Sequence, residues 1–399
     1  MAADGPRVLI VSDQFPPAKG GIGDYTALLS DALVDCDVRV SLFVREGSNP
    51  KACRAPIAAT FHRWSWAALS QLHRTLVATN ADWVHLQHNG GMYGSCPLAG
   101  YFLPRYLRWK RWPGKIAVTF HDLNRAYLFP LAGRLRDWVL ADLAKSADLV
   151  FAADSVDVAE LCSITSTVRQ VPIGSNIPTS TDEAANRTRV RDNYGIPQNC
   201  FLVGHFATAA GLDTLLDAIA TLPNAVLILI GKTQDRGSPG AINIVPDWMH
   251  EQIDRLGLSA RVRWTSHLPV NEVARVLSSC DVLALPYPHG ASLRHGGLLA
   301  CIAQARPVIT TDPPKPIPGL TPGVAILTTK PRDAIALANA IQQVLSNEAL
   351  RNKLTVGAAL ARRVFSWVRI AEYHGTAYRH GAACPMFNFT AESGENLAG

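Results

Sequence analysis

Short apolar, β-branched segments alternate with helical patterns along almost the whole chain, and this alternation restricts the fold more than any other feature of the sequence. A first series runs from residue 7 to residue 173, and a second from residue 201 to residue 365. Strands that alternate with helices predict parallel sheets covered by helices on both faces. We therefore expect an α/β protein with two doubly wound parallel-sheet domains. Ligands of such sheets bind at the carboxyl ends of the strands, which predicts a site in a cleft between two facing domains.

The expected elements follow from apolar runs bounded by turn residues and from apolar positions spaced at helical period. In the first series the strands are 7–12, 38–44, 83–87, 116–120, 149–152 and 168–173, and the helices are 25–34, 67–78, 101–112, 131–144 and 156–162. In the second series the strands are 201–206, 225–230, 262–265, 282–285, 307–310 and 324–327, and the helices are 212–221, 247–256, 271–279, 297–304, 333–346 and 350–365.

Composition shifts between these series predict the domain boundaries. We expect an N-terminal domain at 1–178, a polar, turn-rich linker at 179–199 and a C-terminal domain at 200–365. A helix at 366–383 would pack back on the N-terminal domain, and 384–399 would be a loose tail.

The 399-residue composition excludes several classes of protein. Hydrophobic residues make up 48% and charged residues 18%, which is sufficient for large cores and excludes disorder. Apolar runs stay well below the roughly 20 residues of a membrane span, and the N-terminus has no basic segment of a secretion signal, so we expect a cytoplasmic protein. The net charge of +6 suits phosphorylated ligands or anionic lipid about as well as nucleic acid.

Metal and hydrolase motifs are missing from the sequence. The eight cysteines are widely spaced without a Cys-x-x-Cys pair, which predicts neither a disulfide framework nor a zinc site. Neither a serine nucleophile elbow nor a His-Glu-x-x-His pattern is present. Asp35-Cys36-Asp37 resembles a metal-binding Asp-x-Asp, but it falls between an expected helix and strand, so we interpret it as a turn. We therefore expect no metal.

Two glycine-rich loops each lie between an expected strand and a helix. The first contains Gly20, Gly21 and Gly23, which allow close approach of a ligand to free N–H groups at the helix start. A plain strand-to-helix turn explains it equally well. The second predicts a diphosphate cradle, because a cationic side chain accompanies the helix start; a solvated turn is the alternative. Its candidate residues are Ser292, Arg294, His295, Gly296 and Gly297.

His121 and Asp122 follow a buried strand, where a histidine beside an acid can act as a base or orient a substrate hydroxyl. The alternative is a strand-end histidine bonded to the backbone. Residues 101–115 hold five cations and five aromatic side chains. This mixture predicts peripheral contact with an anionic membrane through Tyr101 to Trp112; it also suits single-stranded nucleic acid, which we do not expect as a partner, or an ordinary amphipathic helix.

In this order and spacing, the segments resemble the GT-B glycosyltransferases of the large retaining family 4, the "group 1" enzymes. Residues 8–25 resemble the family's opening strand and Gly-Gly loop, and 118–122 its strand-end His-Asp element. Residues 203–216 resemble the first strand and helix of the donor domain, and 298–309 its donor-site helix and following strand. The resemblance implies two Rossmann-like domains, with nucleotide-sugar on the C-terminal one.

The sequence departs from the family at four donor positions. Ser292 and Ala300 stand where the family has two glutamates, His205 stands for its arginine, and Ala210 for its lysine. We expect His205 still to contact the donor, and Lys232 and Arg294 to supply replacement charge.

The resemblance implies a metal-independent, retaining glycosyltransferase without a cofactor. Its donor would be a UDP- or GDP-sugar, and its acceptor a hydroxyl of a saccharide or lipid-linked glycan. Two alternatives remain open. The departures are also compatible with a non-catalytic GT-B relative that acts as a binding subunit. A nicotinamide-dependent oxidoreductase would share the sheet type, but the chain has no Gly-x-Gly-x-x-Gly followed by an acid.

Overall fold

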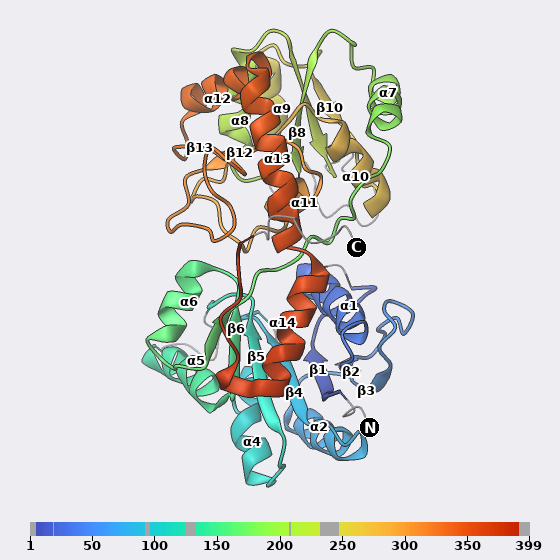
Figure 1. The fold of residues 1–399 in the computed structure, drawn as a ribbon, viewed down its shortest axis with the longest axis vertical. Helices are drawn as coiled ribbons and strands as arrows, with labels where there is room; N and C mark the ends of the chain where they lie inside the picture. The colour runs from blue at the N-terminus through green and yellow to red at the C-terminus, as the bar shows by residue number, and fades with distance from the viewer. Residues whose placement is uncertain are drawn as a thin grey trace, which may run out of the picture. The chain divides into compact units, whose positions relative to one another are not determined.

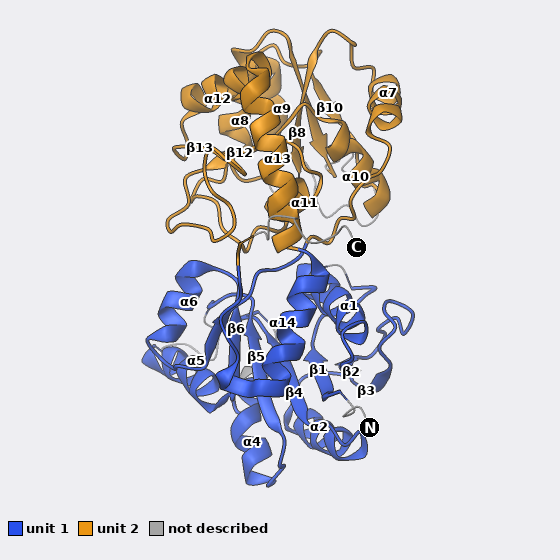
Figure 2. Ribbon diagram, viewed as in Figure 1, with its two compact units in different colours: residues 1–174, 366–388 blue, residues 175–365, 389–399 orange. Residues whose placement is uncertain are grey.

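The computed structural model describes residues 5–18, 20–91, 96–124, 133–206, 209–231 and 247–390. The chain forms two compact units, shown in Figure 2. Unit 1 comprises residues 1–174 and 366–388, and unit 2 comprises residues 175–365 and 389–399. Each unit contains one parallel sheet with helices packed against it (Figure 1). Within the described ranges, no helix has both the length and the apolar character that crossing a bilayer requires.

Unit 1 contains a seven-stranded sheet in the order β3-β2-β1-β4-β5-β6-β7. Its strands are β1 (Arg7–Ser12), β2 (Arg39–Arg45), β3 (Ile57–Phe61), β4 (Trp83–His88), β5 (Lys115–Phe120), β6 (Leu149–Ala152) and β7 (Val168–Gln170). Its helices are α1 (Gly21–Val34), α2 (Trp66–Ala78), α3 (Pro97–Tyr101), α4 (Leu103–Trp109), α5 (Arg134–Ser146), α6 (Ser155–Cys162) and α14 (Trp367–His380).

The alternation of side chains along β4 explains how this sheet is covered. Val84 and Leu86 belong to the apolar cluster that α2, α4 and α5 build on one face. Trp83 and His85 point to the opposite face, where both bond to Tyr378 of α14. Helix α14 also packs along α1 (Figure 1). The last α-helix of the described residues therefore closes the core of unit 1, around polar side chains of the central strands.

Unit 2 contains a six-stranded sheet in the order β10-β9-β8-β11-β12-β13. Its strands are β8 (Phe201–Phe206), β9 (Ala225–Ile230), β10 (Val262–Trp264), β11 (Val282–Leu285), β12 (Val308–Thr311) and β13 (Leu327–Thr329). Its helices are α7 (Glu183–Asn193), α8 (Leu212–Ala220), α9 (Asp247–Arg255), α10 (Val270–Ser279), α11 (Gly296–Ala303), α12 (Ala334–Ser346) and α13 (Glu348–Val364). Helices α8, α9 and α12 share one apolar cluster with the sheet. Among the other helices of unit 2, α10 packs against α7, and α11 packs against α13.

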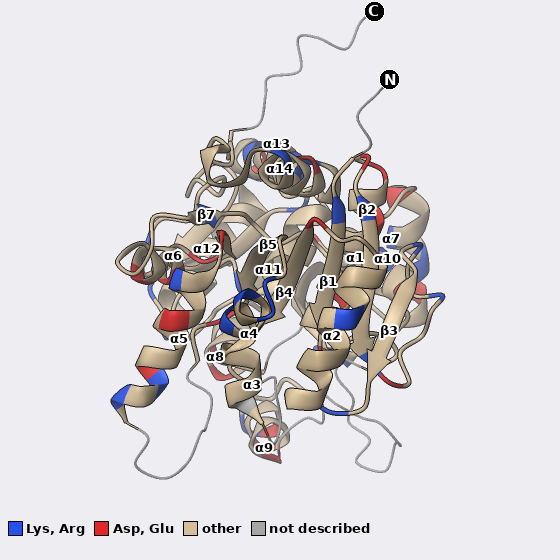
Figure 3. Ribbon diagram, turned by 90° about the horizontal axis from the view of Figure 1, so that it is seen from below, with Lys and Arg blue, Asp and Glu red and all other residues tan. Residues whose placement is uncertain are grey.

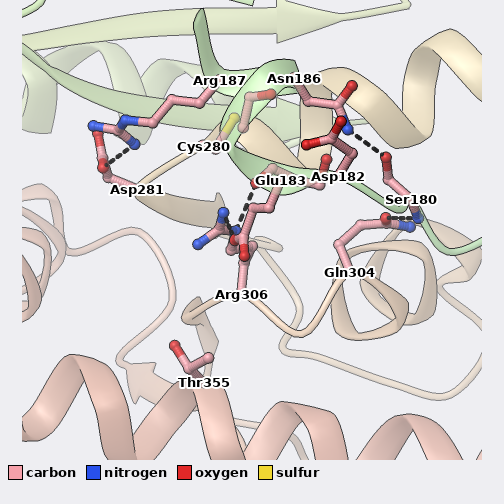
Figure 4. Close-up of polar contacts among 12 residues, drawn as sticks. Ser180, Asp182, Glu183, Asn186, Arg187, Cys280, Asp281, Gln304, Arg306 and Thr355 are labelled. Atoms are coloured by element: carbon pink, nitrogen blue, oxygen red, sulfur yellow. Dashed lines mark hydrogen bonds and ion pairs between the residues drawn. The ribbon is translucent and has the colours of Figure 1, made fainter.

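Helix α7 occupies the stretch in which the sequence predicts a linker, and polar contacts attach it to unit 2 (Figure 4). Arg187 and the fully buried Arg191 both pair with Asp281, at 2.7 and 3.2 Å. Ahead of the helix, the backbone N–H of Ser180 donates to the side-chain oxygen of Gln304 at 3.1 Å. Arginine side chains anchor this helix, and it has no continuous apolar face. Its sequence therefore lacks the pattern that predicts a packed helix and instead predicts a linker.

Most expected elements are present within one or two residues of their bounds. Helix α1 begins at Gly21 instead of 25, and β7 ends at Gln170 instead of 173. The region 101–112 is not one helix, because the chain breaks at Phe102 between α3 and α4, with Pro104 in the first turn of α4. The short edge strand β3 was not expected at all. The last strand begins at Leu327 instead of 324, since Pro322 and Ile326 first form an isolated bridge.

Most aromatic side chains of residues 101–112, the basic aromatic region, pack in or against the core of unit 1. Tyr101 and Trp112 are buried, and Phe102 and Tyr106 pack against the same apolar cluster. Arg105 bonds to Asp142 of α5 at 2.6 Å, and Figure 3 marks the cations of α4 in blue and the acids of α5 in red. Trp109 is the exposed aromatic of this region, with 71% of its surface accessible. The region therefore packs most of its aromatic side chains into unit 1 and leaves its cations exposed.

Candidate functional site

The first glycine loop of unit 1 lies between β1 and α1. Gly20 is the N-cap of α1 and provides no side-chain cap for the first N–H groups of that helix. A Cβ at Gly23 would lie 3.2 Å from the Cα of Phe15, so the helix start packs closely on the preceding loop. Gly21, in contrast, is exposed, and a Cβ there would meet no atom within 4 Å. The backbone at Gly21 is therefore open to solvent, at the positive end of α1.

His121 directly follows β5 and is partly buried. Its Nε2 atom lies 2.9 Å from the side-chain oxygen of Gln87, at the end of the neighbouring strand β4. Burial lowers the pKa of His121 to about 4, although the charge of Asp122 opposes this shift. The imidazole is therefore neutral at physiological pH, and it can accept a hydrogen bond through the nitrogen that does not face Gln87.

Two aromatic side chains extend from His121 toward the start of α14. Tyr25 of α1 packs its ring edge-on against His121, with 4.8 Å between the ring centroids. Trp367 packs against Tyr25 in turn, at 5.4 Å. A Cβ on Gly174 would lie 2.5 Å from the indole of Trp367, so only glycine fits there without displacing the ring. His121 is thus held by side chains from β4, α1 and, through Tyr25, from α14.

Asp122 has a different environment from its neighbour. Its Oδ1 atom accepts hydrogen bonds from the backbone N–H groups of Gly90, at 3.1 Å, and of Asn124, at 3.0 Å. A Cβ at Gly90 would lie 1.9 Å from the carbonyl oxygen of Asn124, so the two loops touch through their backbones. The carboxylate of Asp122 therefore joins the loops that follow β4 and β5.

The second glycine loop connects β11 to α11 in unit 2 and is fixed by the adjacent strand β12. The hydroxyls of Thr310 and Thr311 donate to the carbonyl oxygens of Leu285 and Tyr287, at 2.8 and 2.7 Å. Gly290 has a φ of +88°, and a Cβ there would lie 2.5 Å from the carbonyl oxygen of Asp312. The loop can follow this close path against β12 only with glycine at this position.

The end of this loop forms the start of α11. The backbone N–H of Arg294 donates to the Ser292 hydroxyl at 3.0 Å, and that of His295 donates to the Ser292 carbonyl at 3.1 Å. The His295 ring stacks on buried Tyr287, with 3.7 Å between centroids. Arg294 itself is exposed. Gly296 begins the helix without a side-chain cap, and a Cβ there would meet no atom within 4 Å. The structure thus brings a cation together with uncapped helix N–H groups, as a diphosphate requires.

The other expected donor residues lie differently. His205 is fully buried in β8, and its Nδ1 atom lies 2.8 Å from the carbonyl oxygen of Ala284 in β11. Ala300 is also fully buried, inside α11. Ala210 is exposed and lines a pocket of about 440 Å³, together with Gly211, Trp248, Pro288 and Arg332 among other residues. Lys232 lies outside the described residues.

The sequence analysis did not identify Gln87, Tyr25 or Trp367 as neighbours of His121. One signal was available for Gln87, because His85, Gln87 and His88 interrupt a strand that is buried throughout. Polar side chains in such a strand need hydrogen-bond partners, and they often belong to a site. For Tyr25 and Trp367, which are far apart in sequence, only the packing of α14 on α1 reveals the contact.

Metal ligands and disulfides do not feature in the described structure. Within the described ranges, no group of three or more His, Cys, Asp or Glu side chains could hold a metal ion. Asp35 pairs with Arg54 at 2.7 Å and ends α1, so the Asp-x-Asp lies in a turn, as the sequence predicts. All eight cysteines are free, and Cys280, Cys301 and Cys384 are buried.

Two protein-family models match the chain. The model described as "Glycosyl transferase 4-like domain" matches residues 20–169, and the model described as "Glycosyl transferases group 1" matches residues 189–359. The first therefore covers unit 1 from the start of α1 into β7, without β1, and the second covers most of unit 2.

Similar proteins cover almost the full length of the chain. A D-inositol 3-phosphate glycosyltransferase of Xylanimonas cellulosilytica is 25% identical, over 91% of this chain and 94% of that protein. Among solved structures, sucrose-phosphate synthase from Thermosynechococcus elongatus matches with a TM-score of 0.70 and 20% identity, over 94% of this chain and 98% of that one. Anabaena Alr3699/HepE, solved in complex with UDP, matches with a TM-score of 0.69 and 19% identity, over 92% and 97%.

Proposed function

Because the chain belongs to the family 4-like glycosyltransferases of GT-B fold, we propose that it transfers a sugar from a nucleoside-diphosphate donor to a hydroxyl acceptor. The loop between β11 and α11 carries the proposal, since it combines exposed Arg294 with the uncapped start of α11. The bond between the anomeric carbon and the diphosphate breaks during transfer, and the diphosphate leaves with the electron pair. Fixed positive charge at this point stabilises the leaving group.

We propose a UDP-sugar as the donor. HepE has been solved with UDP and, in a further structure, with UDP-glucose. Ser292, Gly296 and Gly297 would contact the diphosphate beside Arg294. Lys232 and His205 belong to the same proposed site. Because His205 is buried in β8, it would act indirectly, through its contact with the backbone carbonyl of Ala284 in β11. The loop supplies positive charge from the protein itself, which supports transfer without a metal or other cofactor.

The acceptor side is assigned to unit 1. We propose that Gly20, Gly21 and Gly23 line the transferred sugar and that neutral His121 accepts a hydrogen bond from one of its hydroxyls or from the acceptor hydroxyl. Asp122 would act through the loop that carries His121. Transfer would proceed with retention of the anomeric configuration, as in the family that the sequence resembles. The name of the Xylanimonas relative supports a phosphorylated cyclitol or a related saccharide as acceptor.

Peripheral contact with an anionic membrane is a further part of the proposal. Its surface would be the end of α4, where Trp109 is exposed and Lys110 lies 4.4 Å from the centre of the indole. Sedimentation with vesicles tests it: anionic vesicles should carry down more protein than neutral ones, and Trp109→Ala should reduce the difference. Equal recovery with both vesicles would contradict membrane contact.

Transfer itself is tested by a panel of UDP-, GDP-, ADP- and dTDP-sugars with cyclitol phosphate and saccharide acceptors. Release of nucleoside diphosphate that depends on an acceptor is the expected result, with UDP-sugars most active. Product formation should persist in EDTA, and the anomeric proton of the product should show the configuration of the donor. A requirement for added metal or an inverted product would contradict those parts of the proposal. Absence of transfer with every donor would contradict the proposed reaction.

A further inference from the structure

Gln87 connects His121 to a buried polar network in unit 1. Gln87 is fully buried at the end of β4, and its side-chain oxygen lies 2.9 Å from the Nε2 atom of His121. Its side-chain nitrogen lies 3.4 Å from the Nε2 atom of His85 in the same strand. His85 continues the network, because its Nε2 lies 2.7 Å from the Thr119 hydroxyl of β5 and its Nδ1 lies 2.6 Å from the Tyr378 hydroxyl of α14.

The structure orients the Gln87 amide with its oxygen toward His121 and its nitrogen toward His85, and with this orientation one arrangement of protons satisfies the contacts. His85 donates from Nδ1 to the oxygen of Tyr378 and accepts at Nε2 from Thr119 and from the amide group of Gln87. The amide oxygen of Gln87 can then only accept, so the partner atom of His121 must carry a proton. The amide orientation of Gln87 therefore determines the tautomer of His121.

The surroundings of His121 keep it in this neutral state. Tyr25 from α1 faces the ring, Asp122 is adjacent in the chain, and His85 and His88 belong to the neighbouring strand. Burial lowers the pKa of His88 to about 3 and that of His85 well below its usual value, while burial raises the pKa of Tyr25. The charge of Asp122 opposes the effect of burial on His121 but does not outweigh it, so the ring carries a single proton.

We propose that Gln87 is a positioning residue that keeps the proton of His121 on Nε2, so that Nδ1 presents its lone pair to a hydroxyl group of the bound substrate. The assignment of a sugar hydroxyl rests on the proposed function, whereas the tautomer does not. In the opposite tautomer, Nδ1 would carry the proton. His121 would then donate to the same substrate hydroxyl and could not accept a hydrogen bond from it.

The test is ¹⁵N NMR of the full-length protein labelled at histidine, in which protonated and bare ring nitrogens give separate resonances. The His121 signals are assigned by their absence in His121→Gln. In the wild type the proton should be on Nε2. In Gln87→Met, which keeps an unbranched side chain of similar length without the acceptor, a second population with the proton on Nδ1 should appear. Activity should fall about tenfold or more in kcat, with KM for the donor changed less than threefold.

Gln87→Glu provides the second variant. Its carboxylate still accepts from Nε2, so the tautomer should be retained, while the added negative charge should raise the pKa of His121 and move the acid limb of the pH–rate profile toward neutral pH. Gln170→Glu is the matched control. Gln170 lies at the end of β7 in the same sheet and bonds to Ala153 and Ser155, so this variant should leave the His121 resonances unchanged.

A wild-type proton on Nδ1, or the wild-type tautomer in Gln87→Met, would overturn the inference. The proposed function fails differently. If His121→Gln transferred sugar at the wild-type rate while Gln87→Met still shifted the tautomer, Gln87 would position His121 as inferred, but His121 would have no part in transfer.

Discussion

The Oδ1 atom of Asp122 accepts a hydrogen bond from the backbone N–H of Gly90 at 3.1 Å and thereby joins the loops after β4 and β5. This contact requires an acceptor but no negative charge. Asp122→Asn, which retains an oxygen at this position, should therefore keep activity within a few-fold of wild type. Asp122→Leu should lower it by tenfold or more, because two backbone donors lose their partner. Steady-state kinetics of both variants checks this, and a large loss in Asp122→Asn would instead assign the charge a direct part in catalysis.

Buried neutral histidines should make unit 1 sensitive to acid. Burial lowers the pKa of His374 to about 4, against about 6.5 in the unfolded chain. The unfolded state binds the proton more tightly than the folded state. The free energy of unfolding should therefore be at its full value above pH 6.5 and should decrease as the pH drops toward 4. From pH 8 to pH 5, the low pKa of His374 alone should decrease the free energy of unfolding by about 2 kcal/mol.

Urea unfolding between pH 5 and pH 8 measures this effect. In His374→Phe, the new ring can keep the contact with Phe151. The decrease in the free energy of unfolding from pH 8 to pH 5 should be smaller in this variant by about 2 kcal/mol. The exposed Val77 of α2 provides the control, because Val77→Ala removes no titratable group and should unfold with the wild-type pH dependence. A pH-independent free energy of unfolding over this range would show that burial does not lower the pKa of these histidines.

Gly211 should tolerate no side chain. Its φ is +82°, and a Cβ would lie 1.8 Å from the carbonyl oxygen of Pro286, which begins the proposed donor loop. Gly257→Ala is the matched control in unit 2, because Gly257 has a φ of +65° but open space around it. Gly257→Ala should cost roughly 1–2 kcal/mol from backbone strain alone. Gly211→Ala should cost more and should also weaken UDP binding, as urea unfolding and calorimetric titration would show. Equal costs without loss of affinity would mean that the contact with Pro286 is dispensable.

The sequence predicts the sheets well, because periodicity is a local property. Strands such as Phe201–Phe206 and Ala225–Ile230 form at their expected bounds, and the family and GT-B fold expected from the order of the motifs are confirmed. Glycosyltransferase function is likewise confirmed, and the comparisons do not support the non-catalytic alternative. The short edge strand β3 was missed because five residues carry little periodic signal.

The candidate site could be predicted only where its residues are neighbours in sequence. The glycine loops and His121-Asp122 each stand out within a few positions, and these assignments remain predictions. The environment of His121 depends on Gln87, 34 positions away, and on Trp367, which α14 brings beside Tyr25. Such contacts arise from helix packing, which a sequence pattern does not specify. The loop-joining bonds of Asp122 are invisible for the same reason, since they require the backbone of Gly90.

The most direct test of the proposed donor site is a thermal-shift titration with UDP, GDP, ADP and dTDP on the wild type and on Arg294→Ala. Arg362→Ala, which removes an exposed arginine from α13 of the same unit, is the control. UDP at about 100 times its dissociation constant should stabilise the wild type and the control by about 2.7 kcal/mol, a shift of a few degrees. Arg294→Ala should bind at least about tenfold more weakly, since a charge-assisted bond to diphosphate contributes about 1.5–3 kcal/mol. No shift with any nucleotide, or an unchanged affinity in Arg294→Ala, would contradict the proposed donor site.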